Sequence, residues 1–218
     1  MSGMRILAVA DEIAPALDAS LLAELRPDLI LGCGDLPFDY LEYLSKAADA
    51  PLCYVHGNHD PALQSRRVPS YFPLDFAPGK PARVVAGVNV EGRLADMSGV
   101  RIVGLGGSIR HNDGPNQYTE REMRRRVRRL SRSARVRRWR DNGTVDVVIT
   151  HSPPLDCGDG EDAAHRGFAC FHRLLGQLRP RLMLHGHVHP HGFERPDRTI
   201  GSTRIVNVIP FRLIEFDP

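Results

Sequence analysis

The chain has little cysteine, and the few cysteines are widely scattered. Four in 218 residues are too few for a disulfide-stapled domain, and no two have the CxxC spacing of structural zinc sites or dithiol redox centres. We therefore expect free thiols in a protein of the reducing cytoplasm. The cysteines are Cys33, Cys53, Cys157 and Cys170.

Long hydrophobic runs are also missing. No apolar stretch approaches the roughly 18 residues that a membrane helix needs, and Asp11 and Glu12 interrupt the apolar run near the N-terminus. We therefore expect neither a membrane contact nor a secretory signal. The content of 42% hydrophobic and 25% charged residues is that of a globular protein, and the length suits a single domain over residues 1–218.

Lysine is also scarce, and nearly all of the basic residues are arginine. Only two of the 29 basic residues are lysine, which leaves 27 arginines (29 − 2). Eleven of them fall within residues 119–140 beside two glutamates, so this segment carries +9 while the whole chain carries +3. Apolar residues recur there at helical spacing, at Met123, Val127, Leu130 and Ala134. This pattern predicts an amphipathic, Arg-rich helix over about residues 119–141.

The sequence leaves the role of this Arg-rich helix open. The simplest interpretation is a solvated helix in a chain with a general arginine bias. The same charges would suit a lid over an anionic substrate, a contact in a homo-oligomer, or a nucleic-acid footprint. Nucleic-acid binding is the less favoured interpretation, because Tyr118 and Trp139 are the only aromatic residues there that could stack on single-stranded bases.

Strand and helix patterns alternate along the chain. Short apolar runs predict strands at residues 4–10, 29–31, 52–55, 147–150 and 182–184. Helical patterns cover about 16–25, 38–48 and 168–178, besides the Arg-rich segment. Residues 83–107 have the texture of antiparallel hairpins, and residues 204–216 predict two strands divided by Pro210. Together these patterns predict a layered α/β fold with two sheets.

Polar residues with metal-binding or acid–base chemistry follow each of the five strands. In open α/β sheets, ligands bind beyond the carboxyl ends of the strands, so these residues are expected to meet at one edge. They are Asp11, Gly34-Asp35, Gly57-Asn58-His59-Asp60, His151 and His185-Gly186-His187-Val188-His189.

The last of these groups carries three histidines at alternate positions. Residues two apart share one face of a regular strand, so His185, His187 and His189 are expected to project together. Imidazole is the commonest metal ligand and a common proton carrier. The triplet therefore predicts a metal site to which the other strand ends add ligands.

The ordered set from Asp11 to His189 resembles the calcineurin-like metallophosphoesterase superfamily. The resemblance implies a fold of two mixed β-sheets packed as a sandwich and flanked by helices. It also implies a metal-dependent phosphoric ester hydrolase, in which a hydroxide generated at the metal attacks a phosphodiester or phosphomonoester. Two divalent cations about 3.5–4 Å apart can stabilise both the attacking and the leaving oxygen of such a reaction.

The resemblance also implies a role for each residue. Asp35 is expected to bridge two metal ions, and mixed oxygen and nitrogen ligands suit Mn, Fe, Zn or Ni. His59 corresponds to the family's catalytic histidine, as an acid or a stabiliser of phosphoryl oxygens, and His185 is expected to support the ligands from behind. One metal would take Asn58, His151 and His187, and the other Asp11 and His189.

The first motif departs from the family pattern. That pattern is Asp-any-His, whereas this chain reads Asp11-Glu12-Ile13. On a regular strand Ile13 has the correct parity but cannot bind metal, and Glu12 faces away unless a bulge turns it inward. We therefore expect weak or exchangeable metal at the site of Asp11 and His189.

The leading hypothesis is a phosphoesterase acting on a small phosphate ester. Arg110 and His111 follow a glycine-rich strand end and are candidates for contact with the substrate phosphate. One alternative is a non-catalytic binding or scaffold protein on the same fold, which Ile13 favours and His59 opposes. Another is a nucleic-acid-acting phosphoesterase that uses the basic segment 119–140.

Overall fold

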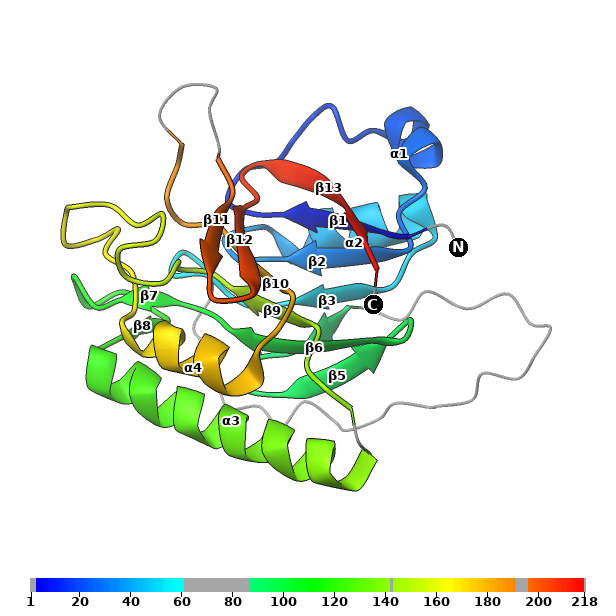
Figure 1. Ribbon diagram of the computed structural model, residues 1–218. Coiled ribbons are helices and arrows are strands. Elements are labelled where there is room, and N and C mark those ends of the chain that lie inside the picture. Colours follow the sequence, from blue (N-terminus) through cyan, green and yellow to red (C-terminus); the bar gives the residue numbers. More distant parts are fainter. Residues whose placement is uncertain (1–2, 61–86, 142, 191–195, 218) are drawn as a thin grey trace.

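Two β-sheets form the centre of the molecule, seen in a computed structural model that describes residues 3–60, 87–141, 143–190 and 196–217, with backbone only for 136–141 (Figure 1). The first sheet has the order β13-β1-β2-β3-β4, parallel except for β13, which runs antiparallel to β1. Its strands are β1 (Met4–Val9), β2 (Leu29–Gly32), β3 (Leu52–Tyr54), β4 (Val88–Asn89) and β13 (Phe211–Phe216).

The second sheet has the order β11-β12-β10-β9-β6-β5. Its four central strands are parallel, and β11 and β5 close its two edges in antiparallel pairing. Its strands are β5 (Leu94–Met97), β6 (Val100–Leu105), β9 (Val147–Thr150), β10 (Leu182–His185), β11 (Arg198–Ile200) and β12 (Thr203–Asn207). A parallel pair of short strands, β7 (Ser108–Ile109) and β8 (Gln117–Tyr118), lies beside it.

Strand alternation places the apolar side chains in three buried layers. On β1, Ile6 and Ala8 enter the layer between the two sheets, whereas Leu7 and Val9 pack toward the helices α1 (Ala19–Leu25) and α2 (Phe38–Ala48). On β9, Val148 likewise faces α3 (Glu120–Asp141) and α4 (Cys170–Leu178). Each sheet is thus covered on its outer face by its own pair of helices, α1 and α2 for the first sheet and α3 and α4 for the second (Figure 1). The predicted fold, two mixed sheets flanked by helices, is confirmed.

The Arg-rich helix α3 begins at a capping box. The Thr119 N–H donates to Glu122 Oε2 at 2.8 Å, and the Glu122 N–H donates to Thr119 Oγ1 at 3.3 Å. This reciprocal pair satisfies backbone donors that the first helical turn leaves open. The predicted apolar stripe is buried against α4 and the second sheet, so the helix packs on the body of the protein along its described length.

Some element boundaries differ from the predictions. Helices α1 and α4 begin at Ala19 and Cys170, later than expected. Strands β5 and β6 form the predicted hairpin, but β4 joins β3 in parallel, because its apolar residues extend the first sheet. Residues 83–86 of the predicted hairpin segment lie outside the described residues.

The structure bears on the scarcity of cysteine and on the lack of long apolar runs. All four cysteines are buried and free. In the part of the chain that the structure describes, no helix has the length and apolarity needed to cross a membrane.

Candidate metal centre

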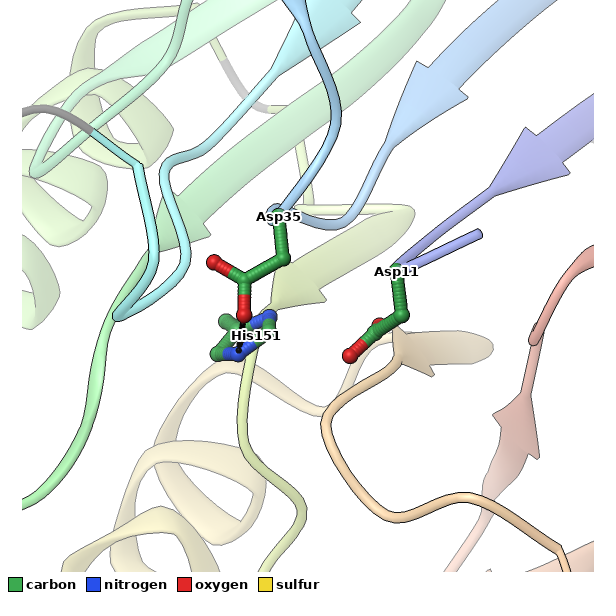
Figure 2. Close-up of side chains that lie close together, drawn as sticks. All are labelled: Asp11, Asp35 and His151. Atoms are coloured by element: carbon green, nitrogen blue, oxygen red, sulfur yellow. Dashed lines mark ion pairs between the residues drawn. The ribbon is translucent and has the colours of Figure 1, made fainter. Parts of the chain in front are cut away.

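Three predicted ligands meet where β1, β2 and β9 end. Asp11 follows β1, Asp35 follows β2 and His151 follows β9, and their side chains point toward one another (Figure 2). One ligand atom of each lies within 4.8 Å of the others. The Asp11 and Asp35 side chains are 6% and 7% exposed and His151 is fully buried, so the two acids are largely removed from water.

The backbone is left-handed at three predicted ligands. Asp11, Asp35 and His187 have φ values of 62°, 56° and 67°. Non-glycine residues rarely adopt this region, and such strain clusters at functional sites, where the surrounding structure holds it in place. At Asp11 the chain reverses, so its carboxylate accepts the His187 N–H at 3.0 Å. This bond joins the first sheet to the second across the site.

Glycines allow the loops of the site to approach closely. A Cβ at Gly186 would clash with the Asp11 carboxylate, and a Cβ at Gly57 would clash with the Asp35 carboxylate. The glycines of the third and last motifs therefore serve to bring the backbone against acidic side chains.

His151 presents one ring nitrogen to two oxygen atoms. Its Nδ1 lies 2.9 Å from the Cys33 carbonyl oxygen, which can only accept, so Nδ1 carries a proton. Its Nε2 lies 3.0 Å from Asn58 Oδ1 and 3.2 Å from Asp35 Oδ2. Without a proton on Nε2, lone pairs of three atoms would converge there. Only a proton or a cation stabilises this arrangement, so the donor set fits a metal with mixed nitrogen and oxygen ligands.

The close approach of these groups changes their pKa values. Burial opposes a charge on His151, but the hydrogen bond to Asp35 and the two nearby carboxylates outweigh it and raise the pKa of His151 to about 9. Burial holds the pKa of Asp11 above its usual value. For Asp35 the effect of burial is overcome by the hydrogen bond and charge of His151, so its pKa lies below its usual value. A proton on His151 thus occupies the place that suits a cation.

His187 lies at the edge of the cluster as a neutral imidazole. Burial lowers its pKa to about 3. Its Nε2 lies 2.8 Å from the Ala164 carbonyl oxygen, so Nε2 carries the proton and Nδ1 keeps the lone pair. Its ring centroid is 4.8 Å from that of His151. A backbone acceptor that fixes the tautomer in this way is typical of metal-ligating histidines.

His59 projects from the loop that holds Asn58. Its backbone N–H donates to Asp35 Oδ1 at 2.7 Å, while the residue itself is exposed. Asn58 is 4% exposed and bonds His151. One turn thus buries a candidate ligand and leaves the candidate catalytic imidazole accessible to a substrate.

The regular strand parity expected through the first motif is wrong. Strand β1 ends at Val9 and the chain turns at Asp11, so strand parity does not extend to Glu12 and Ile13. Glu12 turns toward the site instead of away: its Oε1 lies 2.9 Å from His189 Nδ1. The other ring nitrogen of His189, Nε2, lies 4.0 Å from Asp11 Oδ1.

The predicted common face of the three histidines is also wrong. Strand β10 ends at His185, and the left-handed backbone at His187 breaks the alternation. His185 is buried with its Nδ1 at 3.0 Å from the Gly186 carbonyl, whereas the His189 side chain is 53% exposed. The motif places its residues by a turn rather than by strand pleating.

The two candidate substrate contacts lie on the loop after β7. The Arg110 guanidinium contacts Glu122 Oε2 at 3.1 Å and the Gln117 carbonyl oxygen at 3.4 Å. The exposed His111 has its Nδ1 3.1 Å from the Ile109 carbonyl oxygen. Both side chains therefore have local partners in this structure.

Two residues hold the loops together in roles that were not predicted from the sequence. Asp60 Oδ2 accepts the N–H groups of Gly57 at 2.7 Å and Asp35 at 2.9 Å. The Asn116 amide donates to the Gly57 carbonyl oxygen at 2.9 Å and to that of Asp60 at 3.2 Å. Asp60 is the last residue of the third motif and so had a sequence signal, whereas Asn116 has none.

Comparisons with known proteins agree with this architecture. A family model described as calcineurin-like phosphoesterase matches residues 4–191. One crystal structure shares the fold with a TM-score of 0.62 at 15% identity, over 99% of this chain and all of that one. The crystal structure of TT1561 of Thermus thermophilus has a TM-score of 0.61 at 18% identity, over 94% of this chain and 89% of that one. No curated protein matches the sequence. On the family match, the chain belongs to the calcineurin-like phosphoesterases.

Proposed function

We propose that this protein hydrolyses small phosphate esters with one or two divalent transition-metal ions. The observation that carries the proposal is the buried cluster of Asp11, Asp35 and His151, in which a histidine nitrogen faces two oxygen atoms. Members of the family are generally metal-dependent phosphoester hydrolases. Mn, Fe, Zn and Ni suit such a mixed set better than magnesium, which prefers oxygen ligands.

In this proposal the metals are held by largely buried residues and by the half-exposed His189, and the exposed His59 meets the substrate. Asn58, His151 and His187 would complete one site, Asp11 and His189 would contribute to the other, and Asp35 would serve both. When bound, the metals would lower the pKa of a water molecule and neutralise phosphoryl oxygens. Burial of the two carboxylates keeps their negative charge unscreened, which strengthens their attraction for the cations.

His59 is the proposed catalytic residue. It is exposed beside the buried cluster, and its own backbone N–H anchors it to Asp35. This position suits a side chain that donates a proton to the leaving oxygen or a hydrogen bond to the phosphoryl group. Either role leaves the metal ligands undisturbed.

Glu12 is proposed as a positioning residue for His189. A carboxylate on Nδ1 fixes the tautomer of the imidazole, leaves Nε2 as the ligand atom, and raises its basicity. The 2.9 Å contact to Glu12 and the 4.0 Å approach of Nε2 to Asp11 fit this arrangement. It partly compensates for Ile13, which stands where the family has a ligating histidine.

A Glu12→Ala substitution is expected to weaken metal binding at this site about 10–100-fold, the usual effect of removing such an outer partner. Glu12→Gln keeps a hydrogen-bond acceptor for Nδ1–H and is the matched control, with a smaller loss expected. Titration calorimetry with Mn²⁺ measures both variants. Equal affinities in the wild type and the Ala variant would contradict the role.

The proposed function is tested with chromogenic phosphomonoesters and phosphodiesters. We expect hydrolysis with at least one of Mn²⁺, Ni²⁺ and Zn²⁺, above the rate with Mg²⁺, and its loss on chelation. Metal binding measured by calorimetry in parallel separates two failures. Binding without hydrolysis of either ester would favour the scaffold alternative, and no binding at all would refute the metal centre.

A further inference from the structure

Helix α3 carries the strongest concentration of positive charge in the chain, and most of that charge lies on its exposed side. Eleven of the 27 arginines fall in its 22 residues. A general arginine bias would spread them over the chain, so half of one helix is a local enrichment. The metal centre does not account for it.

The helix cannot turn these arginines inward. Its apolar stripe is buried against α4 and the second sheet, so its rotation about its own axis is fixed. One arginine, Arg126, lies at the edge of the stripe, where it pairs with the largely buried Glu91 and covers the Tyr118 ring at 3.9 Å. The remaining arginines of the described part therefore face solvent.

These residues form what we call the arginine face. It spans about 140° of the helix circumference and about 21 Å of its length, from the rotation and rise per residue of an α-helix. Among the side chains that the structure describes, only one of them, Arg124, has a carboxylate partner, Glu120 at 3.4 Å. The arginine face consists of Arg121, Arg124, Arg125, Arg128, Arg129, Arg132 and Arg135.

The surroundings of the arginine face decide between anionic partners. A membrane-binding helix needs exposed apolar side chains beside its basic ones, and the described part of α3 exposes no large hydrophobic residue. Single-stranded nucleic acid needs aromatic platforms, but Arg126 covers one face of the Tyr118 ring. The side chain of Trp139 lies outside the described residues. A row of guanidinium groups, mostly without carboxylate partners in the described residues and without stacking partners, suits a regular phosphate backbone.

We propose that the arginine face binds the phosphate backbone of double-stranded nucleic acid. Phosphates of one strand are about 3.4 Å apart along a duplex axis, so the face matches roughly six base pairs. Contact through phosphate alone carries no sequence preference.

The position of the helix connects this surface to the metal centre. Helix α3 starts directly after β8, next to the loop in which Asn116 bonds the Gly57 and Asp60 carbonyls. Arg110 of the same loop pairs with Glu122 in the first turn of α3. The first turn of α3 is therefore linked, through this loop, to the turn that carries Asn58 and His59.

The test measures binding of fluorescein-labelled 20-base-pair DNA and RNA duplexes by anisotropy, in EDTA, from 50 to 200 mM salt. With about six phosphate contacts, wild-type affinity should fall about 10³-fold over this range. The variant Arg125→Gln/Arg132→Gln loses two contacts and should fall only about 10²-fold. The matched control Arg26→Gln/Lys46→Gln removes the same charge beside α1 and α2 and should behave as wild type.

Each outcome decides the proposal. Equal slopes for the two double variants would overturn it, because net charge rather than the arginine face would then act. Binding to vesicles containing phosphatidylserine without duplex binding would also overturn it. The comparison of DNA with RNA identifies the preferred duplex. Hydrolysis of a chromogenic diester should be unchanged in the arginine variant, so failure here is distinct from failure of the proposed enzyme activity.

Discussion

A His59→Ala variant is expected to lose about 10²- to 10⁴-fold in kcat for phosphoester hydrolysis, the usual contribution of a general acid, while its metal affinity stays close to wild type. The reason is that the backbone and the side chain of His59 have separate roles. The His59 backbone N–H, which Ala retains, holds Asp35, whereas its exposed side chain is free to act on the substrate. Steady-state kinetics and titration calorimetry on the same preparations measure the two effects.

The leaving group separates the two roles of His59. A proton donor matters more for a poor leaving group, such as an alkoxide, than for nitrophenolate, which departs without protonation. A loss that grows as the leaving group worsens indicates an acid, and a constant loss indicates stabilisation of phosphoryl oxygens. His172→Ala, an exposed histidine on α4, is the control and should not change kcat. Loss of metal affinity together with activity in His59→Ala would contradict the assignment.

Local patterns in the sequence predicted what depends on local physics. The apolar run at residues 4–10 and the helical spacing of apolar residues from Met123 to Ala134 each involve residues close together in the chain, and the predicted strand and helix are both present. The meeting of Asp11 and Asp35 followed from a simple rule, that the parallel strands of one sheet end at the same edge. No distance was needed to predict that these two side chains meet. His151 follows β9 of the second sheet, so its approach to the two acids also depends on how the sheets pack.

The errors came from treating the strand ends as regular strands. A pleated strand continued through Asp11 would point Glu12 away from the site, and one continued through His187 would align three histidines. Left-handed backbone at both positions breaks the alternation. Asp and His adopt this backbone conformation at a cost in free energy that tertiary contacts must offset. Here the hydrogen bond from the His187 N–H to Asp11 is such a contact. Partners 176 residues apart in sequence leave no local signal for such a turn.

An Asp35→Asn variant is expected to lower metal affinity by more than about 100-fold, because even outer partners contribute 10–100-fold. The change is isosteric, so the bond from the His59 N–H to Oδ1 can persist. The second oxygen, which faces His151 Nε2 at 3.2 Å, becomes an amide that repels a cation. Both charge and ligand are lost without a change in shape, and hydrolysis should fall with metal affinity.

Thermal unfolding with and without Mn²⁺ measures this loss apart from activity. A metal at 100 times its Kd stabilises the wild type by about 2.7 kcal/mol, and the rise in Tm should disappear in Asp35→Asn. Asp39→Asn removes the same charge from the exposed first turn of α2 and should keep the full rise. Equal shifts in the two variants would mean that the metal binds elsewhere. Loss of the Tm rise in Asp35→Asn alone would show that the metal binds at the Asp35 carboxylate, which faces His151.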